Sequence, residues 1–193
     1  LDKQFFNPEE FESNVKDIEN LGVQCFGYQL DVTNVEEIKT TREKILKDIG
    51  KIDIIVNNAG IVFGGKFLEL SIDQHKKTYD VNTQGIINML HVFLPDLISQ
   101  QESHIVNIAS ASGFTALPGG ASYASSKAAV SSLSESLRIE LIKDGHKHVG
   151  MTIVSPAYVN TGMFDGVKEP IFIPMLTAEK LAKKIVKAIN KNK

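Results

Sequence analysis

The sequence predicts an α/β domain built on a parallel β-sheet, and three observations support this prediction. Short apolar segments of strand length alternate with longer amphipathic segments along the chain. Segment 52–56 is β-branched and apolar on both sides of Asp53, which favours a strand covered on both faces. Polar segments follow the apolar ones. Strands separated by helices need crossover connections, and crossovers make neighbouring strands parallel.

Capping residues mark where the predicted helices begin. Asn7 stands before Pro8 and two glutamates, which is typical of a first helical turn, and this helix is expected to end near Gly22. Three later helices are expected to be capped by Asn34, Ser71 and Thr177. The first two of these are expected to end near residues 49 and 99, and a further helix is expected over about 123–143.

Four strands are expected, over residues 23–30, 52–56, 104–109 and 149–155. Polar segments follow all four strands, namely Asp31–Thr33, Asn57–Gly60, Ser110–Gly113 and Pro156–Thr161. Ligands of open parallel sheets bind at the carboxyl ends of the strands. The four segments are therefore expected to meet in one crevice.

The composition narrows the class of protein. A chain of 193 residues that is 42% hydrophobic is long enough for one domain with a core. Its net charge of -2 lacks the basic surplus of a nucleic-acid-binding protein. Cys25 is the only cysteine, so no internal disulfide is possible and a cytoplasmic location is expected. No apolar run approaches the roughly 20 residues of a membrane span, and no histidine pair has metal-ligand context.

Three side chains are candidates for catalysis. Tyr123 and Lys127 are four residues apart on an expected helix and so share a face. A cation beside a phenol lowers the phenol's pKa from about 10, which would make Tyr123 a usable proton donor or acceptor. Ser110, at a strand end, has a hydroxyl that could hydrogen-bond a substrate oxygen. The alternatives are an accidental surface pair and a turn serine.

Two further sites have an open interpretation. Segment 57–60 has small residues that would let a cofactor approach the backbone, or it is an ordinary asparagine-rich turn. Asn82 lies inside an expected helix, where asparagine competes for backbone hydrogen bonds. It either supports a local kink or holds a water.

These motifs, taken in order, resemble a known family. The series is Asp31-Val32-Thr33, Asn57-Asn58-Ala59-Gly60, Asn82, Ser110, Tyr123-xxx-Lys127 and Pro156-xxxx-Thr161. It is similar to the motif series of the short-chain dehydrogenase/reductase family, over about residues 2–190. The resemblance implies a Rossmann-type doubly wound parallel sheet in three layers, α/β/α. It also implies that residues 1–193 form a single NAD(P)-binding domain.

The resemblance implies a role for each motif. Tyr123 would be the catalytic acid/base and a substrate contact, Lys127 would lower its pKa and hold the nicotinamide ribose, and Ser110 would orient the substrate oxygen. Asn82 would hold a water linked to Lys127. The other implied cofactor contacts are Asp31 and Val32 at the adenine, Asn57, Ala59 and Gly60 at the adenosine side and ribose, and Pro156, Val159 and Thr161 towards the nicotinamide. The implied reaction is hydride transfer between NAD or NADP and a small-molecule alcohol or ketone.

The sequence also departs from the family pattern. The glycine-rich phosphate loop, the first strand, most of the second strand and the final strand are not in it, so the domain is expected to be truncated at both ends. Strand 23–30 would then lose its neighbours, and its backbone groups would lack partners. Ala157 stands where the family has glycine. The alternative functions are therefore a catalytically silent binding domain or an inactive gene fragment.

Finer expectations rest on single features. If Leu1–Lys3 is the end of the second strand, the carboxylate of Asp2 would repel a 2′-phosphate and favour NAD over NADP; otherwise Asp2 is a frayed terminal residue.

The chain is similar to the retinol and hydroxysteroid dehydrogenase branch, in which loop 162–176 would cover a lipid-like substrate. The alternative is that this loop packs on the domain. A homodimer or homotetramer is implied, and membrane association is expected only through an absent N-terminal segment.

Overall fold

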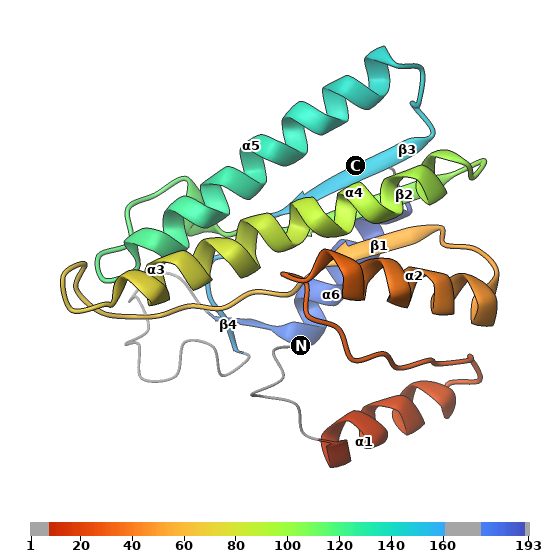
Figure 1. Cartoon of the computed structure of the whole chain (residues 1–193), viewed down its shortest axis with the longest axis horizontal. Helices are drawn as coiled ribbons and strands as arrows, with labels where there is room; N and C mark the ends of the chain where they lie inside the picture. Colours follow the sequence, from red (N-terminus) through yellow and green to blue (C-terminus); the bar gives the residue numbers. More distant parts are fainter. Residues whose placement is uncertain (1–7, 161–174, 192–193) are drawn as a thin grey trace.

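The computed structural model describes residues 8–160 and 175–191 (Figure 1). The α-helices are α1 Pro8–Glu19, α2 Val35–Ile49, α3 Ile72–Tyr79, α4 Gly85–Ile98, α5 Ala121–Lys143 and α6 Ala178–Ile189. A π-helical turn, Asp80–Gln84, joins α3 to α4, and a 3-10 turn spans Ala111–Gly113. The strands are β1 Ile54–Asn57, β2 Ser103–Ile108, β3 Val149–Val154, β4 Val159–Asn160 and β5 Leu176–Thr177.

The main sheet is parallel, as the sequence predicts. Its described strands are ordered β1-β2-β3, with Ile55 opposite Ile105 and Ile105 opposite Met151. Helices α4 and α5 pack on one side of this sheet, and α6 contacts β3 from the other (Figure 1). The fold is therefore a three-layer α/β/α arrangement of the Rossmann type.

Capping residues place the helices where the sequence predicts them. The side chain of Asn34 accepts hydrogen bonds from the backbone N–H groups of Glu36 and Glu37, and α2 ends at Gly50 with a positive φ of 91°. Ser71 forms a reciprocal capping box with Gln74 at the start of α3. The helix predicted from Ser71 to residue 99 is formed as one continuous helix, and its hydrogen bonding is of the π type over residues 80–84. A hydroxyl caps α6 as well, that of Thr177.

The strand predicted over residues 23–30 is not formed: residues 24–30 have no regular secondary structure. Within the described residues, β1 pairs only with β2, so no strand lies beside its other edge. Without a neighbouring strand, the backbone N–H and C=O groups of residues 23–30 gain no inter-strand hydrogen bonds from a strand conformation. The sequence anticipates this outcome, because the strands expected to flank this segment are absent from it.

Strand β1 is covered on one face only, which corrects the prediction for segment 52–56. Ile55 is 8% exposed, whereas Ile54 is 48% and Val56 is 50% exposed. Side chains of a strand alternate between faces, so Ile54 and Val56 share the uncovered face. The physical reason is that, of the described helices, α6 reaches β3 but has no comparable contact with β1.

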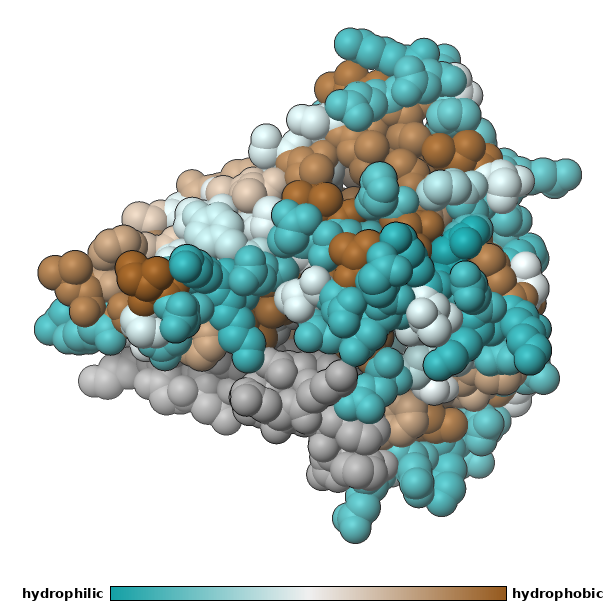
Figure 2. All heavy atoms as spheres, viewed as in Figure 1, coloured by the Kyte–Doolittle hydropathy of each residue, from teal (hydrophilic) through white to brown (hydrophobic). Residues whose placement is uncertain are grey.

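The hydrophobic core lies between the sheet and helices α2, α4 and α5. Its fully buried side chains include Ile38, Leu97, Ile105 and Val130. Hydrophobic side chains also gather on the surface where α3 begins, and Phe67, Leu68 and Ile72 are exposed there (Figure 2). In the described ranges, no helix has both the length and the hydropathy required to cross a bilayer.

Candidate active site

Helix α5 carries Tyr123 and Lys127 on one buried face, as their spacing predicts. The Lys127 Nζ lies 5.9 Å from the centroid of the Tyr123 ring. It also donates a hydrogen bond of 2.7 Å to the carbonyl oxygen of Ile108, the last residue of β2. The ammonium group is thus fixed between α5 and the carboxyl end of the central strand, where a ligand of this sheet would bind.

Ser110 lies directly beyond β2 and contributes the second hydroxyl group. It caps the 3-10 turn, and its Oγ accepts hydrogen bonds from the Ser112 backbone N at 3.2 Å and the Ser112 Oγ at 2.9 Å. A side-chain hydrogen bond also joins Ser110 to Tyr123. The structure therefore brings Ser110, Tyr123 and Lys127 together, although they come from two elements.

Burial controls the ionisation of this group. It raises the pKa of Tyr123, and the hydrogen bond from Ser110 opposes this rise without cancelling it. Burial also lowers the pKa of Lys127 to about 8. The net pKa of Tyr123 is thus raised by burial, and the expected role of Lys127 in lowering it stays a prediction. The cause is removal of both groups from water, which disfavours their charged forms.

Asn82 lies at the centre of the π-helical turn and is fully buried. Its Oδ1 accepts a hydrogen bond of 2.8 Å from the Ile61 backbone N, and its Nδ2 donates one of 2.9 Å to the Ile61 carbonyl. The Nδ2 also donates to the Ser126 Oγ at 3.0 Å. The helix does change geometry at Asn82, but its side chain bonds to Ile61 and Ser126 and not to the backbone of its own turn, and its expected role in holding a water stays a prediction. Such turns are frequent at functional sites.

Gly60 lies where these groups converge. A Cβ atom at residue 60 would lie 3.3 Å from the Asn82 Oδ1 and 3.4 Å from the Lys127 Nζ. Both contacts would be tighter than usual, so the space beside Gly60 is bounded by an amide oxygen and an ammonium group. A hydrogen atom in place of a side chain keeps this space open, as expected for a backbone that a cofactor approaches.

Three of the expected cofactor residues line one small cavity. Val32, Asn57 and Ala59 surround a volume of about 60 Å³ together with residues of the π-helical turn and α4. A Cβ at Gly85 would lie 2.7 Å from the Val32 Cγ2, so glycine at the start of α4 lets Val32 pack closely. Asp31 does not line this cavity: its Oδ1 accepts hydrogen bonds from the Thr33 backbone N and hydroxyl.

A buried polar chain behind Asn57 is not anticipated from the sequence. The Asn57 Nδ2 donates a hydrogen bond of 2.7 Å to the Asn107 Oδ1, and the Asn107 Nδ2 donates one of 2.9 Å to the Ser134 Oγ. This chain links β1 to β2 and β2 to α5. The available signal is Asn107 itself, a polar residue between Val106 and Ile108 in β2.

His75 is also not anticipated as part of the site. Its Nε2 lies 3.0 Å from the Phe67 carbonyl oxygen, and its Nδ1 lies 2.6 Å from the Ser122 Oγ. A carbonyl oxygen only accepts hydrogen bonds, so in the neutral ring Nε2 donates to Phe67 and Nδ1 accepts from Ser122. This contact ties α3 to the first turn of α5, next to Tyr123.

The remaining predicted residues are placed only in part. The Pro156 carbonyl oxygen accepts a hydrogen bond of 2.9 Å from the Ala111 backbone N, which joins the end of β3 to the turn after Ser110. Val159 lies in β4 opposite Leu176. Asp2, Thr161 and most of loop 162–176 lie outside the described residues.

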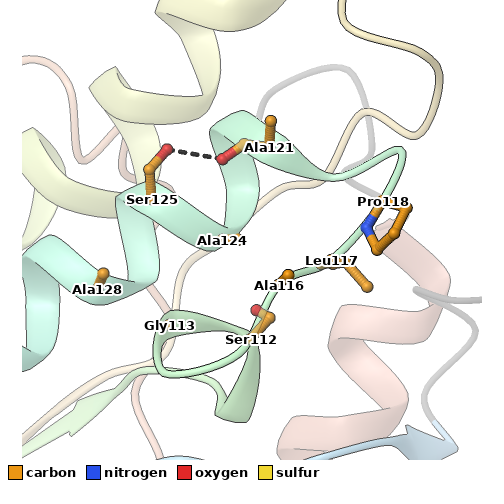
Figure 3. Close-up of a pocket in the computed structure, with 9 residues that line it drawn as sticks. All are labelled: Ser112, Gly113, Ala116, Leu117, Pro118, Ala121, Ala124, Ser125 and Ala128. Carbon is orange, nitrogen blue, oxygen red and sulfur yellow. Dashed lines mark hydrogen bonds between the residues drawn. The ribbon is translucent and has the colours of Figure 1, made fainter.

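A larger hollow, of about 440 Å³, lies between segment 112–118 and α5 (Figure 3). Its wall on α5 includes Ala121, Ala124 and Ala128. Successive helical residues are about 100° apart, so these alanines lie on a face of α5 next to the one that bears Tyr123 and Lys127, with Ala124 about 60° from Lys127. The hollow is also lined by Ser112, whose backbone N and hydroxyl bond to the Ser110 Oγ, so it lies beside the catalytic candidates.

Comparison with known proteins agrees with this geometry. The family model described as short chain dehydrogenase matches residues 6–171. The chain belongs to the short-chain dehydrogenase family. This short-chain dehydrogenase is 35% identical to epidermal retinol dehydrogenase 2 of Mus musculus over 164 residues, which cover 84% of the chain and 53% of the relative. It is 32% identical to short-chain dehydrogenase/reductase 3 of Homo sapiens, over 94% of the chain and 60% of the relative.

The short-chain dehydrogenase is thus similar to the retinol dehydrogenase branch, and it spans about half the length of the curated relatives it matches. Among solved structures, it resembles a short-chain dehydrogenase/reductase from Burkholderia phymatum in complex with NAD. The TM-score is 0.84 at 25% identity, with coverage of 96% of this chain and 75% of the other. It also resembles an NAD+-bound xylitol dehydrogenase with a TM-score of 0.74 at 29% identity, over 81% and 59% of the two chains.

Proposed function

We propose that this chain forms the catalytic part of an NAD(P)-dependent oxidoreductase that interconverts an alcohol and its carbonyl compound. The observation that carries the proposal is the shared buried site in which the hydroxyls of Ser110 and Tyr123 hydrogen-bond beside the Lys127 ammonium. A proton donor, a second hydroxyl and a nearby cation are what the reduction of a carbonyl needs from a protein.

In the reductive direction, the Tyr123 hydroxyl gives its proton to the substrate oxygen. The Ser110 hydroxyl donates a hydrogen bond to the same oxygen and stabilises the charge that develops there. The Lys127 ammonium then stabilises the tyrosinate that remains. The raised pKa of Tyr123 keeps this residue protonated at neutral pH, which suits its role as an acid. Oxidation of an alcohol uses the same groups in reverse.

The described residues fit a nicotinamide cofactor. Val32, Asn57 and Ala59 line a cavity, and Gly60 follows Ala59 and packs beside the Lys127 Nζ. A bound nicotinamide cofactor supplies or accepts the hydride in this family. Asp31, Pro156, Val159 and Thr161 remain proposed contacts of the cofactor. Asp2 remains the proposed reason for a preference for NAD over NADP.

The proposed substrate is an apolar or lipid-like alcohol or ketone. Relatives named retinol dehydrogenases support this substrate class. The exposed hydrophobic side chains where α3 begins are consistent with an apolar ligand or partner at that end of the molecule. Half-buried small residues of α5, including Ala128 and Ala129, support assembly as a homodimer or homotetramer through this helix.

Comparing wild-type chain with Tyr123→Phe tests the proposal. Binding of NADH and NADPH is measured by calorimetry, and turnover is measured with retinol and with small secondary alcohols. We expect wild type to bind cofactor and turn over substrate, and Tyr123→Phe to bind cofactor with a turnover lower by at least about 100-fold, because proton transfer contributes that much. Equal turnover of the two proteins contradicts the assigned role of Tyr123.

A catalytically silent binding domain or inactive fragment is the second candidate, and the half-exposed Ile54 and Val56 favour it. Apolar side chains on a sheet face that no described element covers add little to the free energy of unfolding, and a less stable fold holds a cofactor less well. The same calorimetric titration separates the two candidates, since a wild-type chain that binds neither NADH nor NADPH supports the silent domain.

A further inference from the structure

The hydroxyl oxygen of Ser110 accepts as many hydrogen bonds as its lone pairs allow. It accepts one hydrogen bond from the Ser112 backbone N at 3.2 Å and a second from the Ser112 Oγ at 2.9 Å. A serine hydroxyl has two acceptor lone pairs and one donor hydrogen. With both lone pairs used by Ser112, the hydrogen is the only hydrogen-bonding capacity that Ser110 has left.

We propose that Ser112 is a positioning residue, whose hydroxyl fixes the Ser110 hydroxyl as a donor, directed at the Tyr123 oxygen in the free chain and at the substrate oxygen when a substrate is bound. This inference rests on the proposed function for its catalytic consequence, but not for the hydrogen-bond geometry itself. The effect of Ser110 on Tyr123 agrees with the direction of donation: a hydrogen bond lowers the pKa of a phenol when it is donated to the phenolate.

The place of Ser112 is set by packing of the turn against α5. A Cβ at Gly113 would lie 2.9 Å from the Ala128 backbone N and 3.0 Å from the Lys127 carbonyl carbon. The turn that bears Ser112 therefore rests directly on the backbone of the helix that bears Tyr123 and Lys127. The Gly113 backbone N further donates to the Ser110 carbonyl oxygen at 3.0 Å, which closes the turn.

An alanine at residue 112 separates positioning of the hydroxyl from formation of the turn. Ser112→Ala keeps the backbone N–H that caps the turn and removes only the hydroxyl donor. One lone pair of Ser110 is then free, so its hydrogen can rotate towards other acceptors. Ser112→Thr retains a hydroxyl and should rescue the effect. Thr115→Ala is the matched control, since its hydroxyl bonds to the Ala111 carbonyl of the same turn.

The first readout is independent of turnover. The ultraviolet absorbance of tyrosinate is titrated in wild type, Ser112→Ala, Ser112→Thr and Thr115→Ala, each with and without Tyr123→Phe, so that the signal of Tyr123 is obtained by difference. We expect the pKa of Tyr123 to rise in Ser112→Ala and to stay at its wild-type value in the other two variants. An unchanged pKa in Ser112→Ala overturns the inference, whether or not the chain is active.

The second readout is kinetic. We expect kcat to fall roughly 3- to 10-fold in Ser112→Ala, the effect of one neutral hydrogen bond, with KM little changed. The pH at which alcohol oxidation reaches half its maximum should shift upwards together with the pKa of Tyr123. A wild-type chain that lacks turnover while Ser112→Ala still raises this pKa contradicts the proposed function and leaves the positioning role supported. A pure KM effect in an active chain contradicts the positioning role.

Discussion

Lys127 and Tyr123 show how burial sets the charge of individual residues at this site. Burial raises the pKa of Tyr123 and lowers the pKa of Lys127 to about 8, so the uncharged forms of both are favoured. At neutral pH, Tyr123 is protonated, while Lys127 still carries its charge but loses it more easily than an exposed lysine does. Both groups are thus harder to charge in the folded chain than in water.

Replacing Lys127 with Met is expected to remove a pH dependence of stability. The pKa of Lys127 falls from 10.5 to about 8 on folding, so the unfolded chain binds more protons between these values and the free energy of unfolding rises with pH across this window. The rise attributable to Lys127 amounts to about 3 kcal/mol. Urea denaturation on both sides of the window measures it.

The control for this experiment is Lys187→Met, because the side chain of Lys187 is exposed on α6. Lys187→Met should retain the wild-type dependence on pH, and Lys127→Met should lose that part of it. If Lys127→Met and wild type have the same slope between these pH values, burial of the ammonium is not the cause.

At the scale of elements, local signals predict the helices well. Asn34, Ser71 and Thr177 cap their helices because a cap depends on residues two or three positions away. Contacts between distant segments have no such signal. The hydrogen bonds between His75 and Ser122 and between Asn107 and Ser134 join residues 47 and 27 positions apart, so no local pattern reveals them.

Gly113 has a strict steric requirement, because its neighbours are backbone atoms of α5. Gly113→Ala should lower the free energy of unfolding by about 1–3 kcal/mol, because a Cβ there would press on the backbone of α5, which cannot move cheaply. The matched control is Gly64→Ala, since a Cβ at Gly64 would meet no atom within 4 Å. Chemical denaturation of both variants measures the difference. Equal losses in the two variants would show that the contact with α5 is unimportant.

Across the whole molecule, the sequence predicts the parallel sheet, its flanking helices and the catalytic candidates Ser110, Tyr123 and Lys127. It does not predict how each strand is covered, because coverage depends on which other elements are present to pack. Segment 23–30 has the composition of a strand, but no described strand lies at the free edge of β1 to pair with it. The residues that determine catalysis are thus more predictable than the extent of the sheet.

Because the sheet is covered unevenly, the same valine-to-alanine substitution should lower the free energy of unfolding by different amounts on β1 and β2. Val56 and Val106 are neighbours on β1 and β2, yet Val56 is 50% exposed and Val106 is fully buried. Val106→Ala should cost about 2 kcal/mol in free energy of unfolding, and Val56→Ala about half as much or less, because less apolar surface leaves the interior. Thermal or urea unfolding of the two variants checks this ratio. A larger loss for Val56→Ala would mean that another part of the protein covers this face.

The contact between Gly113 and the backbone of α5 has a consequence for how this enzyme family can diversify. The turn that follows Ser110 rests on the helix that bears Tyr123 through main-chain atoms at Gly113. Substitutions that reshape the surroundings of the substrate therefore leave that contact unchanged. New specificities can arise around a reaction centre whose internal dimensions stay constant.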